Sequence, residues 1–242
     1  MKEYVKKYIS IILAVVLLIP LFPNTIVFAQ GYSEHSIQQN YVRIIQDDDS
    51  KRVAEGIENG FKFIATLNKA NNTIELVKED INNGAVLSSF TVDLNHQLSR
   101  EKFDNTIEMR SGSINQNTFS NYEYTKWYGS PNKWELRRPR EGFGFNNTYY
   151  FRTKQTSSNE KYLTNFYNAV EDINQLEKDY LTFVSLETLT GTLGAIFSGG
   201  LGTFLAAAGL GAEATRIAFK IQSACRKAED NYWEVFNKRV SY

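Results

Sequence analysis

The sequence predicts an α+β protein, and three patterns along its 242 residues support that prediction. Short apolar runs separated by Asn- and Gly-rich turns occupy residues 30–158 and indicate antiparallel strands. Apolar residues at intervals of three and four recur over residues 159–242 and indicate helices. An uncharged, Gly- and Ala-rich stretch, residues 188–212, interrupts the helical pattern. We therefore expect a small N-terminal β-meander, an aromatic-rich region of strands and loops, and a C-terminal helical region.

The first 29 residues have the pattern of a secretory signal peptide. Three lysines precede an aliphatic run over residues 9–19, and Val27-Phe28-Ala29 places short side chains at the two positions that signal peptidase reads. We expect cleavage after Ala29 and secretion of the mature chain. An uncleaved N-terminal anchor is the alternative, which the prolines at positions 20 and 23 disfavour.

The β-rich part begins with a predicted meander. Residues 61–67 and 73–77 are expected to pair as a hairpin around the Asn-rich turn between them. A third strand is expected over residues 86–94, after a second Asn- and Gly-containing turn. Short edge strands at residues 43–45 and 52–54 complete the expected sheet.

The following segment, residues 119–158, combines seven basic and three acidic side chains with a dense set of aromatic residues. Three interpretations stay open: a β core with cation–π pairs at its edges, a belt of aromatic and basic side chains at lipid headgroups, and a platform that stacks sugars or bases. For surface contact, the candidate residues are Trp127, Trp134, Arg137, Arg138 and Arg140.

The C-terminal part predicts two amphipathic helices around the uncharged stretch. The first is expected over residues 162–186, with a residue of 157–159 as its N-cap, and the second over residues 213–240. The apolar face of the second helix includes Cys225, the only thiol. We favour a buried Cys225 over one that crosslinks two chains.

The uncharged stretch is the strongest functional signal in the sequence. As one helix, its 25 residues would be ~37 Å long, enough to cross a bilayer core of about 30 Å. Its seven glycines lower helix propensity in water by roughly 6–7 kcal/mol relative to alanine. We expect a turn at residues 198–200 that divides it into a helical hairpin, either inserted in a membrane or permanently buried between the flanking helices. The candidate insertion residues are Leu193, Ile196, Phe197, Gly199, Gly200, Leu201, Gly202, Phe204 and Leu205.

The composition excludes several classes of protein. With 27 basic and 27 acidic side chains, the chain is not a generally basic nucleic-acid binder. One cysteine and two distant histidines exclude a disulfide framework and a Cys-based zinc site. The common motifs of hydrolases, nucleotide-binding loops and calcium loops are absent. We expect no enzymatic activity, no catalytic residue, no cofactor and no metal.

The signal peptide, the strand–turn–strand that begins at Gly60-Phe61-Lys62-Phe63, and the Gly-rich stretch before a helix with one Cys together resemble the geobacillin-type family of large secreted bacteriocins. That resemblance implies antibacterial activity. The expected partners are a target-cell membrane or surface receptor and a cognate immunity protein, with no nucleic acid. The alternative is a non-enzymatic extracellular protein that binds cell wall or carbohydrate. The oligomeric state stays open.

Overall fold

The computed structural model describes residues 40–94, 113–140 and 148–241, and these form an α+β protein with two antiparallel sheets and four helices. The predicted fold class is confirmed. The predicted signal peptide and its cleavage site lie outside the described residues.

The first sheet is a five-stranded antiparallel meander with its strands in chain order. The predicted hairpin over residues 61–67 and 73–77 is confirmed, with Ala65 opposite Leu76. The strand expected over residues 52–54 is longer and lies inside the sheet rather than at its edge, because it pairs on both sides. The strands are β1 Tyr41–Asp47, β2 Lys51–Glu58, β3 Phe61–Asn68, β4 Thr73–Glu79 and β5 Val86–Asp93.

The second sheet has four antiparallel strands, again in chain order, and contains the aromatic and basic segment. Because side chains alternate between the two faces of a strand, Trp134, Leu136 and Arg138 share the face covered by helices, while Glu135 and Arg137 share the other. The strands are β6 Ser113–Gln116, β7 Glu123–Trp127, β8 Lys133–Pro139 and β9 Thr148–Lys154.

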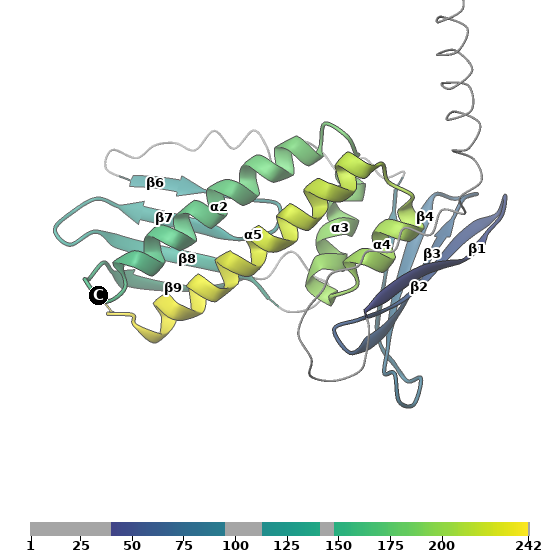
Figure 1. Cartoon of the computed structure of the whole chain (residues 1–242). Helices are drawn as coiled ribbons and strands as arrows, with labels where there is room; N and C mark the ends of the chain where they lie inside the picture. The colour runs from purple at the N-terminus through teal and green to yellow at the C-terminus, as the bar shows by residue number, and fades with distance from the viewer. Residues whose placement is uncertain (1–39, 95–112, 141–147, 242) are drawn as a thin grey trace, which may run out of the picture.

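The four helices divide between the two sheets. The long helices α2 and α5 run antiparallel, pack against each other and cover the second sheet, whereas α3 and α4 pack on the first sheet (Figure 1). The helices are α2 Glu160–Tyr180, α3 Leu186–Ser198, α4 Leu201–Ala208 and α5 Ala212–Asn237.

Two expectations for the helical part are wrong. The first amphipathic helix ends at Tyr180, so Phe183, which continues its apolar spacing, lies in the connecting turn and is 56% exposed. The uncharged stretch is also not enclosed mainly by the flanking helices. The first sheet presents an apolar face that includes Ala54, Phe63 and Leu76, and α3 and α4 cover it.

Candidate functional site

The uncharged stretch lies on the inner face of the first sheet. Helix α4 crosses β1 to β4, and α3 contacts β4 and β5 (Figure 1). Tyr180 at the end of α2 also shares a buried hydrogen bond of 2.9 Å with the Thr192 hydroxyl in α3. The stretch therefore belongs to the core of the folded protein.

Most of its candidate insertion residues are in the interior. Leu193, Leu201, Phe204 and Leu205 are at most 5% exposed, and Gly200 is also buried. Ile196, Phe197, Gly199 and Gly202 are partly buried. In this conformation none of the nine lies freely on the surface, so contact between these residues and a membrane requires α3 and α4 to leave the sheet.

Several glycines of the stretch allow close contact with aromatic rings. A Cβ atom on Gly200 would lie 2.5 Å from Cδ1 of Phe63 in β3, closer than two non-bonded carbon atoms can approach. A Cβ atom on Gly191 would lie 2.6 Å from Cζ of Phe204. Gly199 has φ +90°, a left-handed conformation that ends α3. The glycine content thus has a packing role in the folded state.

A carboxylate of the first sheet caps helix α4. Glu58, the last residue of β2, accepts hydrogen bonds from the backbone N–H of Gly202 at 2.9 Å and of Thr203 at 2.9 Å. It also accepts one from the Thr203 hydroxyl at 2.6 Å. The N-terminus of a helix carries unpaired N–H groups and partial positive charge, which a carboxylate satisfies. This Glu58 cap ties the uncharged stretch to the sheet.

Two of the proposed surface-contact residues do not lie on the surface. Trp134 is 3% exposed, and its indole N–H donates to the Gln155 side chain at 3.1 Å. Arg138 is 6% exposed and pairs with Glu229 of α5 at 2.9 Å. Both occupy the face of β8 that α2 and α5 cover. The expectation that they contact a surface is therefore corrected.

The other three candidates are more accessible. Arg137 lies on the uncovered face of β8, where it pairs with Glu135 at 2.6 Å and approaches the Tyr150 ring. Trp127 is partly buried at the end of β7, and Arg140 is exposed just after β8. These three residues lie at different places on the second sheet and do not form one site.

Arg140 instead belongs to a set of arginine and aromatic side chains that combines the end of β8, the start of β9 and the C-terminal part of α5. Arg140 lies 4.7 Å from the Tyr149 ring centre, and Arg138 lies 5.0 Å from Tyr149 and 4.8 Å from Trp233. We call the set the arginine–aromatic cluster. Its members are Arg138, Arg140, Tyr149, Trp233, Phe236 and Arg239.

Trp233 and Phe236 of α5, and Arg239 just after it, are absent from the sequence-based candidates. The periodicity places Tyr232 and Val235 on the buried face of that helix, which leaves Trp233 on its accessible side. A large aromatic residue outside the apolar face of an amphipathic helix is the signal that could have identified it. The contact with β8 depends on tertiary structure and has no signature in the sequence.

A buried polar group joins α2 to the loop before β7. Glu177, 1% exposed, accepts hydrogen bonds from the backbone N–H of Phe119 at 2.8 Å and Ser120 at 2.9 Å. Burial raises the pKa of its carboxyl to about 7, although these donors oppose the shift. Cys225 is also buried, as favoured from the sequence. The pKa of its thiol is raised, mainly by burial and to a smaller extent by the negative charge of Glu177.

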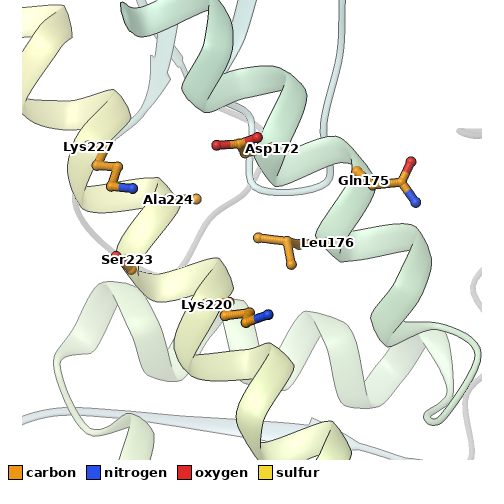
Figure 2. A pocket seen from close by; sticks show the side chains of 7 residues that line it. All are labelled: Asp172, Gln175, Leu176, Lys220, Ser223, Ala224 and Lys227. Atoms are coloured by element: carbon orange, nitrogen blue, oxygen red, sulfur yellow. The ribbon is translucent and has the colours of Figure 1, made fainter.

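A shallow groove of about 340 Å³ runs between α2 and α5 on the side away from the second sheet (Figure 2). Asp172 and Leu176 of α2 face Lys220 and Lys227 of α5 across it. Asp172 and both lysines are exposed, so the groove has the character of a solvated helix–helix seam.

Within the described residues, no set of three or more His, Cys, Asp or Glu side chains could hold a metal ion. No helix in those same parts of the chain is both long and apolar enough to span a bilayer. No family model, curated protein or solved structure matches the chain.

Proposed function

We propose that the protein is a secreted, bacteriocin-like antibacterial protein that acts on target-cell membranes through residues 188–212. The observation that carries the proposal is the way this uncharged stretch is attached to the first sheet. The stretch is held by side-chain packing, glycine–ring contacts and a few hydrogen bonds, among them the Glu58 cap and the bonds of Asn59 to the Gly199 carbonyl and of Tyr180 to Thr192; none of its residues is charged. Its apolar surface could therefore move from the sheet to lipid without taking a charged group into the bilayer.

The lengths of the helices define what such a change requires. Helices α3 and α4 contain 13 and 8 residues, or ~20 Å and ~12 Å, so neither alone spans a core of about 30 Å. The whole stretch as one helix would be ~37 Å long. Activity therefore requires α3 and α4 to leave the sheet and either straighten at Gly199-Gly200 or insert as a shallow pair.

A second candidate function is non-enzymatic binding of cell wall or carbohydrate outside the cell. The deep burial of Leu189, Leu201 and Phe204, each 0% exposed, favours this alternative because it suits a permanent core. Trp127 and Tyr150, which share the uncovered face of the second sheet, would then be the stacking residues.

A lysine at Ser198 separates the two candidates. Ser198 is the last residue of α3 and is partly buried, and a positive charge there is favourable at the C-terminus of a helix. A substitution at Gly200 is unsuitable because it would collide with Phe63 in the folded state. The matched control is Ser157→Lys, in an exposed turn before α2.

The measurement is dye release from anionic liposomes by protein purified from the culture medium, together with growth inhibition of Gram-positive strains. A lysine near the middle of an inserting helix costs about 3 kcal/mol, so Ser198→Lys is expected to raise the half-maximal leakage concentration roughly 100-fold. Ser157→Lys should leave it unchanged. No leakage by the unmodified protein, or equal leakage by both variants, would reject the proposal. Retention on purified peptidoglycan that is lost in a Trp127→Ala/Tyr150→Ala variant would support the second candidate.

A further inference from the structure

We infer that the arginine–aromatic cluster is the surface through which the protein first binds a membrane, and that its ligand is the anionic headgroup layer of a phospholipid bilayer. This inference rests on the membrane activity proposed above. It names a contact site that is separate from the uncharged stretch.

The cluster is continuous from strand to helix. Arg140 lies over Tyr149, Tyr149 and Trp233 both lie beside Arg138, and Trp233 packs edge-on against Phe236 with ring centres 5.4 Å apart. The guanidinium carbon of Arg239 in turn lies 3.7 Å from the Phe236 ring centre. Cationic and aromatic groups thus form one continuous set, in which Arg138 is the buried member.

The exposed parts of the cluster have the chemistry of a membrane interface. Tyr149 is 46% exposed and Trp233 41%, so each ring is partly accessible while its other side packs on protein. Amphipathic aromatic rings beside cationic side chains are enriched at the headgroup level of membranes. Arginine also binds phosphate oxygens with two parallel hydrogen bonds, which suits a phosphodiester headgroup.

The charge of the cluster is positive although that of the chain is not. Among the described residues, the carboxylate that pairs with the cluster is Glu229, which accepts from Arg138 at 2.9 Å and from the Trp233 indole N–H at 2.7 Å. Arg138 and Glu229 compensate each other, and the exposed Arg140 and Arg239 supply the attraction for anions. The formal net charge of the whole chain is zero, so general basicity would not produce binding.

The cluster belongs to α5 and the second sheet rather than to the first sheet. Arg138 and Tyr149 are opposite each other near one end of the β8–β9 pairing, and Arg239 follows α5, next to the other end of β9, where Val240 accepts a hydrogen bond from Lys154. The uncharged stretch packs on the first sheet, so a first contact through the cluster does not require it to move.

Sedimentation with vesicles of phosphatidylglycerol and phosphatidylcholine tests the charge requirement. An Arg140→Gln/Arg239→Gln variant should bind anionic vesicles roughly 30-fold more weakly, which corresponds to about 1 kcal/mol per arginine near an anionic surface. The matched control, Lys220→Gln/Lys227→Gln, removes the same charge from the groove between α2 and α5 (Figure 2) and should bind nearly as the unmodified protein does. Thermal unfolding of each variant verifies that it is folded.

Tryptophan fluorescence tests which part of the protein contacts the vesicle. The chain has three tryptophans, and Trp134 is buried. In the unmodified protein, the tryptophan emission should shift to the blue on anionic vesicles and should be quenched by brominated lipid. Both effects should be lost in Trp233→Phe. They should be kept in Trp127→Phe, which alters the other face of the second sheet.

Three results would overturn the inference: equal weakening by the arginine and lysine pairs, equal binding to purely neutral vesicles, or loss of the shift in Trp127→Phe instead of Trp233→Phe. Vesicle binding that depends on the cluster without any dye release would keep the inference and reject the proposed killing activity. Dye release that is insensitive to the arginine substitutions would reject the cluster and keep that activity.

Discussion

Removal of the Glu58 cap should weaken the attachment of α4 to the first sheet. Glu58 accepts three hydrogen bonds, from Gly202 N–H, Thr203 N–H and the Thr203 hydroxyl. Loss of a helix cap costs about 0.5–2 kcal/mol, and loss of a carboxylate at a helix N-terminus adds about 0.3–1 kcal/mol. Because Glu58 is partly exposed, we expect Glu58→Ala to lower the free energy of unfolding by about 2 kcal/mol.

Two measurements test this expectation. A loss of about 2 kcal/mol corresponds to a fall in Tm of roughly 4–8 °C for a chain of this size. In hydrogen exchange, the amides of α4 should exchange up to roughly 30-fold faster through local opening. Glu58→Gln, which keeps one acceptor oxygen, should have about half the effect.

The matched control is Glu75→Ala, an exposed carboxylate on the outer face of β4. It should change stability by no more than about 0.5 kcal/mol. The reasoning is refuted if Glu58→Ala and Glu75→Ala unfold at the same temperature, or if the faster exchange in Glu58→Ala is spread over α2 and α5 rather than α4.

Three further predictions concern packing, protonation and the thiol. Gly200→Ala should destabilise the fold by about 1–3 kcal/mol in urea denaturation because its Cβ would overlap the Phe63 ring. Gly129→Ala should be nearly neutral because its Cβ would come no closer than 3.4 Å to a neighbouring atom, the Pro131 carbonyl oxygen. The Glu177 pKa rises from 4.5 to about 7 on folding, so the native state holds the extra proton between these values. Stability should therefore fall by about 3 kcal/mol as pH rises through that window, and the Gln variant of Glu177 should lack this slope; a parallel slope in the variant would contradict the assignment. Cys225 should react with a thiol reagent only in denaturant, and rapid labelling of the native protein would show that the burial is wrong.

The sheet elements were predictable where local sequence determines them. The hairpin of β3 and β4 follows from alternating apolar residues around an Asn-rich turn. The end of β2 was missed, although Asn59-Gly60, with φ of +54° and +79°, is a dipeptide typical of two-residue hairpin turns. The error came from reading residues 52–54 as an isolated edge strand and leaving that turn unused.

The site was less predictable because its residues are brought together by tertiary contacts. Aromatic and basic residues in 119–158 could not be assigned to a face without the register of β8, which turns Trp134 and Arg138 inward. The uncharged stretch was identified from its composition, but its partner was not. Nothing local specifies that Gly200 packs on a ring in β3, some 140 residues earlier in the chain.

The energetics connect the arginine–aromatic cluster with the uncharged stretch. If α3 and α4 leave the sheet, Phe63, Ile74 and Leu76 lose their cover, and exposing three such side chains costs about 5–9 kcal/mol. The apolar residues of the stretch would move from one apolar environment to another, so their transfer to lipid offsets little of that cost. Binding of Arg140 and Arg239 at an anionic surface would supply about 2 kcal/mol toward it. On the proposed mechanism, the stretch is expected to stay on its sheet in water and to be released only where the cluster is already bound to a membrane.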